Sequence, residues 1–208
     1  MGNDGSRNVI ICGVGGQGNV TAARLLATAT IQSGYTTAVG DVFGLTQRGG
    51  SVASHVRWVI GRQLPPLVPR QRLDILIGFE PLEAFRTLSQ FGCKDTKAVV
   101  NDMAVMPLGV LQGRFAYPER TVLWKALRTY TSEIKSFNAT KVAVELGNIQ
   151  CMNMVMMGAL FGSGFTEIDR KKFEIVLSSL PESPMRDINV KAFRKGYEII
   201  QHQEIATS

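Results

Sequence analysis

Hydrophobic and polar positions along this chain follow two different periods, and the shorter one marks strands. Unbroken apolar runs rich in branched residues at 8–12, 74–79 and 98–101 are typical of strands buried on both faces of a parallel sheet. Residues 35–42 predict another strand, and 134–137 a short one. These segments therefore predict a largely parallel sheet.

The segment 51–60 has a different pattern, because its side chains alternate in character. Apolar side chains and one serine share one face, and the other face carries the polar pair His55 and Arg57. This alternation predicts a strand with one wetter face. A lone histidine in a strand is usually a structural residue, so we do not expect His55 to act as a general base.

The helical period dominates the rest of the chain. Residues 19–33 place Ala22, Leu25, Leu26 and Ala29 on one face, and Gly34 is positioned to end that helix. Glu80 and Pro81 predict the start of a second helix, since proline suits a first turn. Further helices are predicted at 121–131, 139–147, 149–161, 168–178 and 189–203. The order of elements indicates an α/β fold with a helical C-terminal third.

Composition fits one globular domain over 1–208, with 1–6 as a loose terminus. Hydrophobic residues make up 45 % of the 208 residues and charged residues 19 %. The formal charge of +6 comes from scattered Lys and Arg, which argues against nucleic-acid binding. No apolar run reaches the roughly 18 residues of a membrane span. We expect neither nucleic acid nor membrane as a partner.

The cysteines Cys12, Cys93 and Cys151 are far apart, and no Cys/His cluster occurs. This spacing predicts no zinc or iron–sulfur site in the chain. The odd cysteine count and the lack of a signal peptide favour the reducing cytoplasm. Cys12 and Cys151 lie in apolar segments, so we expect buried packing residues and not nucleophiles.

A glycine loop follows the first strand and precedes the first helix. It contains Gly13, Gly15, Gly16, Gln17 and Gly18. Glycines let the backbone approach a ligand, and the free N–H groups at a helix start attract anions. The loop is a candidate site for a phosphate-bearing ligand. The alternative, a turn that only packs strand against helix, is equally compatible with the residues.

A second loop, between the strands at 35–42 and 51–60, is more informative. Its glycines, amide, guanidinium and hydroxyls can bind a carboxylate, a phosphate or another chain. The candidate binding groups are Thr46, Gln47, Arg48, Gly49, Gly50 and Ser51. No Ser/His/Asp or Cys/His catalytic set can be argued from the spacing.

Four ordered segments together resemble one known family. The glycine loop is followed by the Gln47–Ser51 segment with His55 to Arg57, by Gly78–Ala84 and by Glu145–Asn148. Over about residues 7–200 the chain resembles the gamma-type domain of pyruvate and 2-oxoacid:ferredoxin oxidoreductases, above all the beta subunit of the indolepyruvate enzymes. The resemblance implies a Rossmann-like, mostly parallel sheet flanked by helices.

The resemblance also implies an activity that this chain cannot perform alone. The family oxidatively decarboxylates a 2-oxoacid with CoA, giving acyl-CoA, CO2 and reduced ferredoxin. It implies thiamine diphosphate, Mg2+ and [4Fe-4S] clusters on a large alpha subunit, and CoA at the level of the complex. We expect no cofactor and no metal in this chain, a hetero-oligomer that delivers electrons to ferredoxin, and a homodimer as an accessible state of the isolated chain.

The resemblance leaves the substrate and two other function classes open. Relatives act on pyruvate, branched-chain oxoacids and 2-oxoglutarate, so the oxoacid is not fixed. One alternative is a stand-alone NAD- or FAD-binding oxidoreductase, with Asp41 on the ribose. The other is a non-catalytic interaction protein on the same fold. Under the favoured interpretation, Thr46, Gln47 and Arg48 form a wall of an active site on the partner.

Overall fold

The chain folds around one six-stranded sheet, seen in a computed structural model that describes residues 5–44, 50–106, 110, 112–114 and 116–207. The strands lie in the order β2-β3-β1-β4-β5-β6. β1 pairs in parallel with β4, β4 with β5 and β5 with β6, whereas β3 runs antiparallel to both β1 and β2. The strands span Arg7–Val14, Thr36–Phe43, Ser51–Val59, Ile75–Gly78, Lys97–Asn101 and Glu133–Phe137.

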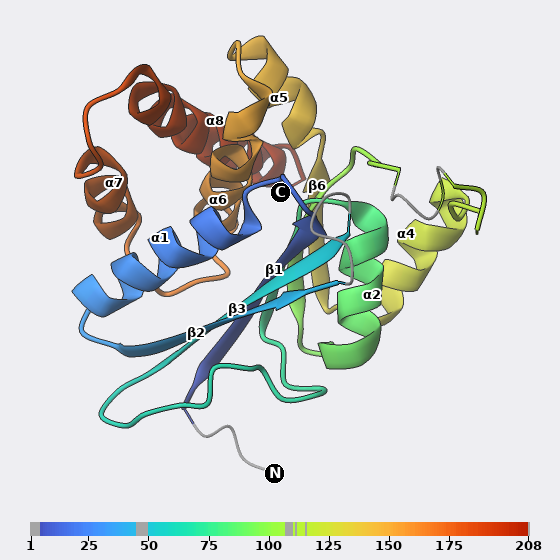
Figure 1. The fold of residues 1–208 in the computed structure, drawn as a ribbon, viewed down its shortest axis with the longest axis horizontal. Helices are drawn as coiled ribbons and strands as arrows, with labels where there is room; N and C mark the ends of the chain where they lie inside the picture. The colour runs from blue at the N-terminus through green and yellow to red at the C-terminus, as the bar shows by residue number, and fades with distance from the viewer. Residues whose placement is uncertain (1–4, 45–49, 107–109, 111, 115, 208) are drawn as a thin grey trace.

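Helices cover both faces of this sheet (Figure 1). One layer contains α1, α5, α6, α7 and α8, and the other contains α2 and α4. The first layer spans Asn19–Gln32, Ala139–Glu145, Met152–Gly162, Arg170–Ser178 and Pro184–Thr207. The second spans Pro81–Phe91 and Arg120–Thr129. The predicted α/β class, the mostly parallel sheet and the helical C-terminal third are confirmed.

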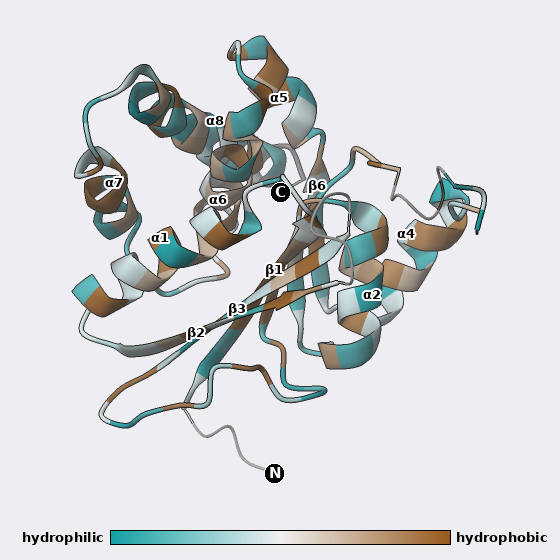
Figure 2. Cartoon of the chain, viewed as in Figure 1, coloured by the Kyte–Doolittle hydropathy of each residue, from teal (hydrophilic) through white to brown (hydrophobic). Residues whose placement is uncertain are grey.

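The central strands bury apolar side chains on both faces, which explains their unbroken apolar runs. In β1, Val9 and Ile11 join the core under α1 and α6, whereas Ile10 and Cys12 join the core under α2 and α4. Figure 2 shows the same division: the central strands are largely brown, and the helices carry brown and teal side by side. A helix with both colours thus has one buried face.

Helix α6 lies at the centre of the larger layer, and all of its residues are buried. It crosses α8 closely because both helices carry glycine at the contact. A Cβ on Gly158 would lie 1.8 Å from the Phe193 carbonyl oxygen, and one on Gly196 would lie 1.9 Å from that of Val155. The apolar, Met-rich stretch of the sequence is therefore a buried helix. Among the described residues, no helix combines the length and apolar character of a membrane span.

The predicted wetter face of β3 is wrong. His55 and Arg57 are only 1 % and 4 % exposed. The proline-containing segment 60–73 covers them: His55 Nδ1 accepts from the Val68 N–H at 3.1 Å, and Arg57 donates to the Pro65 carbonyl oxygen at 2.8 Å. The alternation of side chains is real, but both faces of the strand are buried.

Several predicted ends of helices are close to those observed. Gly34 has φ +90° just after α1, and Pro81 opens α2, as expected. The segment predicted as one helix at 149–161 divides into a 3-10 turn at Ile149–Cys151 and α6. The last helix is longer than the predicted 189–203, because it already begins at Pro184.

Candidate functional site

The two loops singled out in the sequence lie together at the carboxyl edge of the sheet. The glycine loop follows β1 there, and the second loop connects β2 to the start of β3. The Gly15 N–H donates to the Gly50 carbonyl oxygen at 2.8 Å. The Gly44 N–H donates to the Ser51 carbonyl oxygen at 2.7 Å. In open α/β sheets this edge is the usual place for ligands.

Only part of the second loop can be placed. Gly50 and Ser51 are described, and they continue directly into β3. Thr46, Gln47, Arg48 and Gly49 lie outside the described residues. The described segments on either side of them end at Gly44 and begin at Gly50, both at this edge of the sheet.

The interior of the glycine loop is filled by the loop's own glutamine. Gln17 Oε1 accepts from the Val14 N–H at 2.7 Å, and Gln17 Nε2 donates to the Phe79 carbonyl oxygen at 3.2 Å. A Cβ on Gly13 would lie 2.5 Å from Gln17 Oε1, and Gly16 has φ +103°. Gly13 is thus required for packing and Gly16 for the turn, independently of any ligand.

The start of α1 is packed on one side and uncapped on the other. Gly18 is the N-cap with φ +83°, and a Cβ there would lie 2.4 Å from Asn153 Nδ2. No side chain caps the helix, and its first turn carries no acid. The Asn19 Oδ1 atom is buried without a hydrogen-bond partner among the described residues. An uncapped, acid-free helix start is compatible with an anion.

Amide side chains join the ends of neighbouring strands at this edge. The fully buried Asn101, at the end of β5, donates through Nδ2 to the Phe79 carbonyl oxygen at 3.1 Å. Its Oδ1 accepts from the Ala139 N–H at 2.9 Å, which fixes the start of α5. The Phe79 carbonyl oxygen thus accepts hydrogen bonds from the side-chain amides of Asn101 and Gln17. These bonds connect the glycine loop to the ends of β4 and β5.

The carboxylates at the start of α2 have structural roles. Glu80 Oε2 accepts from the Glu83 N–H at 2.9 Å and so caps the helix. Glu80 Oε1 accepts from the Tyr117 hydroxyl. Burial raises the pKa of Glu80, and burial together with the Glu80 carboxylate raises the pKa of Tyr117. Glu83 Oε1 forms an ion pair with Arg86 at 2.7 Å.

Sequence reasoning missed Tyr117. It lies in a Pro- and Gly-rich stretch with no periodicity, and nothing in the local sequence pairs it with Glu80. Beside the Glu80–Tyr117 contact is a largely apolar pocket of about 280 Å³. Its lining includes Met103, Leu123 and Trp124, with the Asp102–Arg120 ion pair at 2.6 Å.

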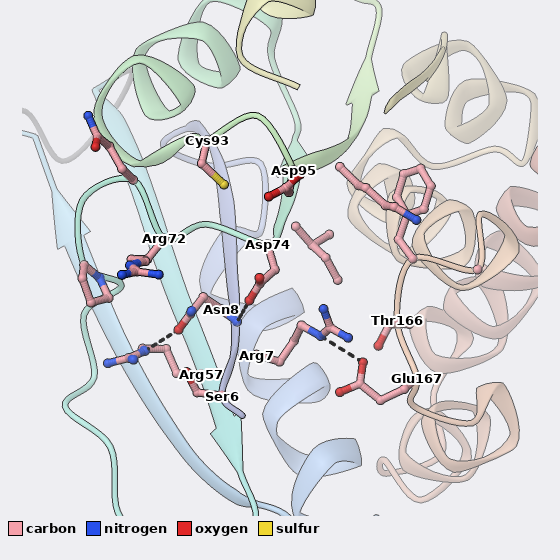
Figure 3. A pocket seen from close by; sticks show the side chains of 16 residues that line it. Ser6, Arg7, Asn8, Arg57, Arg72, Asp74, Cys93, Asp95, Thr166 and Glu167 are labelled. Atoms are coloured by element: carbon pink, nitrogen blue, oxygen red, sulfur yellow. Dashed lines mark hydrogen bonds and ion pairs between the residues drawn. The ribbon is translucent and has the colours of Figure 1, made fainter. Parts of the chain in front are cut away.

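A larger cavity, of about 840 Å³, lies at the opposite, amino edge of the sheet (Figure 3). Charged groups in its wall contact one another or the backbone. Arg7 pairs with Glu167 at 3.2 Å, Arg57 donates to Asn8 Oδ1 at 2.7 Å, and Asp74 accepts from the Asn8 N–H at 2.7 Å. The Arg7–Glu167 ion pair joins the start of β1 to the segment at 164–167. Neither sequence motif reaches this cavity.

The remaining candidate groups do not form a reactive centre. Cys12 is 1 % exposed, and burial raises the pKa of its thiol, so the nucleophilic thiolate is disfavoured. Burial lowers the pKa of His55 to about 4. Asp41 Oδ1 accepts from the Ser54 hydroxyl at 2.5 Å, which engages the carboxylate considered for a ribose. Among the described residues, no three His, Cys, Asp or Glu side chains gather as metal ligands do.

Comparison with known proteins assigns the family. The family described as pyruvate ferredoxin/flavodoxin oxidoreductase matches residues 8–199. The chain belongs to this family. It is 36 % identical to indolepyruvate oxidoreductase subunit IorB of Thermococcus kodakarensis over 194 residues, which cover 91 % of this chain and 93 % of the relative.

Two further matches agree with this assignment. Pyruvate synthase subunit PorC of Methanothermobacter marburgensis is 30 % identical over 194 residues, covering 91 % of this chain and 95 % of the relative. The gamma subunit of a keto/oxoacid ferredoxin oxidoreductase from Geobacter sulfurreducens superposes with a TM-score of 0.67 at 18 % identity, covering 95 % of this chain and 99 % of that one. The predicted resemblance to the gamma-type domain is confirmed.

Proposed function

We propose that this chain is the small, cluster-free subunit of a 2-oxoacid:ferredoxin oxidoreductase of the indolepyruvate type. The observation that carries the proposal is the family match over residues 8–199, together with 36 % identity to an IorB subunit along nearly the whole length of both chains. The reaction is the oxidative decarboxylation of an aryl pyruvate with CoA. The 30 % identity to a PorC subunit makes pyruvate the competing substrate.

The proposal assigns the redox chemistry to the large partner subunit. That subunit would hold thiamine diphosphate, Mg2+ and [4Fe-4S] clusters, which would supply the decarboxylation chemistry and the electron transfer to ferredoxin. The described part of this chain offers no cluster of metal ligands, and Cys12 and Cys151 are both buried. The residues present do not fit an iron–sulfur cluster or a metal ion, so the contribution of this chain is to bind, orient and enclose.

The enclosing surface is the second loop. Its candidate groups, Thr46, Gln47, Arg48, Gly49, Gly50 and Ser51, form a wall of the cleft whose reactive cofactor is on the partner. The hydrogen bond from Gly15 to Gly50 supports this role, because it fixes one end of the loop to the sheet edge. A guanidinium on such a loop can bind the carboxylate of an oxoacid or a phosphate group.

The glycine loop is the candidate site for the CoA pyrophosphate. CoA supplies the thiol that accepts the acyl group. The uncapped first turn of α1, without an acid, fits an anion. Gln17, however, already fills the inside of the turn formed by Gly13, Gly15, Gly16 and Gly18. An anion would therefore lie against the helix start and not inside the turn.

The role of the loop is tested by Arg48→Ala in the complex reconstituted with the large subunit. Loss of a charged hydrogen bond to substrate is expected to lower kcat/KM about ten- to hundredfold. Arg24→Ala, at an exposed position on α1, is the matched control. Thermal unfolding of the isolated chain should be the same for both variants. Unchanged turnover in Arg48→Ala would exclude the loop from the mechanism.

The CoA site is tested by a new charge in the first turn of α1. Thr21 is exposed there, so the carboxylate of Thr21→Glu interacts favourably with the helix dipole but repels a pyrophosphate. We expect a higher KM for CoA with an unchanged unfolding midpoint. Thr28→Glu, exposed near the other end of α1, is the control. Equal KM values in both variants would mean that the glycine loop serves packing alone.

A further inference from the structure

The outermost strand, β2, has a free hydrogen-bonding edge. In the described part of the chain it pairs with β3 alone. The Gly44 N–H donates to the Ser51 carbonyl oxygen across this pair, so even-numbered residues of β2 direct their backbone groups towards β3. Odd-numbered residues direct theirs away from the sheet. These are Thr37, Val39, Asp41 and Phe43.

This edge lacks the features that protect the edges of soluble sheets. Such edges usually carry lysine, proline or a bulge, or they are very short. β2 is 8 residues long and has no Lys, Arg or Pro. Its one charge, Asp41, accepts a hydrogen bond from Ser54 within the sheet. Val39, Val42 and Phe43 are 36 %, 46 % and 58 % exposed. An apolar, unprotected edge indicates a strand that is covered in the assembled protein.

We propose that β2 pairs antiparallel with β2 of a second copy, about a twofold axis at Val39, and so joins two six-stranded sheets. Such a pair is self-complementary, because each copy supplies the same strand. It involves neither the glycine loop nor Arg48, so it stands apart from the proposed function.

The sequence of β2 favours this register over the symmetric ones centred on Gly40 and Asp41. Side chains directly opposite one another across the joint share a face of the sheet. The twofold axis therefore lies between one residue and the same residue of the second copy. An axis at Asp41 places two carboxylates opposite each other, which is unfavourable. An axis at Gly40 places Val39 opposite Asp41 and Thr37 opposite Phe43, which mismatches apolar and polar side chains.

An axis at Val39 matches the side chains instead. Val39 then lies opposite Val39 of the second copy, and the Thr37 hydroxyl lies opposite the Asp41 carboxylate. Tyr35, just before β2, lies opposite Phe43. Apolar, polar and aromatic partners each stabilise such cross-strand pairs. On the other face Ala38 lies opposite Gly40, so no bulky side chains meet. This complementarity of the strand with itself favours a second copy as the occupant.

The first test measures the mass of the full chain in solution by light scattering after gel filtration. The wild type is expected at twice the 22.7 kDa of one chain. Val39→Lys, at the axis, is expected to give the single-chain mass. Val122→Lys is the matched control, because Val122 is 60 % exposed on α4, on another part of the surface. A monomeric wild type, or a dimer that survives Val39→Lys, would overturn the proposal.

The second test fixes the register by crosslinking. Backbones at an axis through Val39 place the two Cα atoms about 5.5 Å apart, within reach of a short bismaleimide that joins two thiols. Val39→Cys is therefore expected to give a covalent dimer with this crosslinker. With this axis Phe43 lies opposite Tyr35 of the second copy, eight residues away from the other Phe43. Phe43→Cys is therefore expected to stay monomeric on a non-reducing gel. The opposite pattern would overturn the axis at Val39.

The competing occupant is a strand of the large subunit. In that case Val39→Lys would abolish co-purification with the large subunit, while the isolated wild-type chain would be monomeric. That result would overturn pairing between two copies. If two copies pair as proposed, Val39→Cys also crosslinks within the assembled complex.

Discussion

Substitution of Gly16 and of Gly18 in the glycine loop should lower the stability of the fold for different reasons. Gly16 has φ +103° and open space around its Cα, whereas Gly18 has φ +83° and faces Asn153 at a distance that excludes a Cβ. Both positions require a backbone conformation that L-residues adopt only with strain. Only Gly18 is also required by packing, because Asn153 is 7 % exposed and has little room to move.

We therefore predict that Gly16→Ala destabilises the fold by about 1–2 kcal/mol, from backbone strain alone. Gly18→Ala should cost roughly 1–3 kcal/mol more, because the added methyl group overpacks the contact with Asn153. Urea unfolding of both variants measures the difference. In an Asn153→Ala background the extra cost of Gly18→Ala should shrink. Equal costs for the two glycines would contradict the packing role.

His55 is a buried histidine whose neutral form the fold requires. Its Nδ1 accepts from the Val68 N–H, and burial is the main cause that lowers its pKa from 6.5 to about 4. The nearby Asp41 opposes this shift, and Arg57 adds to it. As the pH falls below about 6.5, the unfolded chain takes up a proton before the folded chain does. The free energy of unfolding therefore falls between pH 6.5 and 4. Below pH 4 His55 causes no further change in it.

The predicted loss from His55 is on the order of 3 kcal/mol across this pH range. Urea unfolding at a series of pH values measures it. His55→Gln removes the titrating group, so its stability should depend less steeply on pH over the same interval. His202, which is exposed, gives the control variant His202→Gln with the wild-type slope. An unchanged slope in His55→Gln would show that other groups cause the acid sensitivity.

At the scale of elements, one side chain joins the stretch after β5 to the start of α2. Tyr117 donates to Glu80 Oε1, and Glu80 also caps α2. Glu80 is fully buried, so removal of the tyrosine hydroxyl leaves its oxygen without that donor in a poorly solvated place. A buried acceptor that loses its donor typically costs about 1–3 kcal/mol.

Tyr117→Phe is therefore predicted to lower the free energy of unfolding by about 1–3 kcal/mol. Hydrogen exchange should speed up in residues 116–120 and in the first turn of α2, because the hydroxyl connects them. Tyr130→Phe is the control: Tyr130 packs against the same core beside Phe85, and a change within about 0.5 kcal/mol is expected there. Unaltered exchange around Tyr117 would show that the hydroxyl does not fix this stretch.

The elements with a strong period were predictable, because local pattern determines them. The apolar runs of β1, β4 and β5 are buried on both faces, and α1 ends where Gly34 permits a left-handed turn. The second face of β3 was not predictable. Whether His55 meets water depends on the 60–73 segment, whose path over the sheet has no period to read.

The candidate site was predictable in its segments but not in its contacts. The glycine loop and the second loop were both identified, and the hydrogen bond from Gly15 to Gly50 brings them together. The sequence does not show that Gln17 folds back into its own turn, or that Asn153 covers Gly18. Gln17 also depends on the Phe79 carbonyl oxygen, and both Phe79 and Asn153 are distant in the chain. The wall residues 46–49 remain a prediction.

At the scale of the whole molecule, the two cores share the same strands. β4 contributes Ile75 and Ile77 to the core under α1 and α6, and Leu76 to the core under α2 and α4. Loss of either helical layer exposes one face of these strands to water. We therefore expect the two layers to unfold together and not as separate units.

The chain contains two tryptophans, one on each side of the sheet, which make this expectation measurable. Trp58 is buried in the larger core, and its indole N–H donates to Glu167 at 2.8 Å, whereas Trp124 packs against the smaller core. Trp58→Phe and Trp124→Phe each leave one fluorescent reporter. In both variants the midpoint of urea unfolding by fluorescence should coincide with the midpoint by far-UV circular dichroism. Trp58→Phe should lower the free energy of unfolding by about 1–3 kcal/mol, since the smaller ring leaves a cavity in the larger core. If the Trp124 signal changed before the helical signal, the layer of α2 and α4 would unfold first, and the shared strands would not couple the two cores.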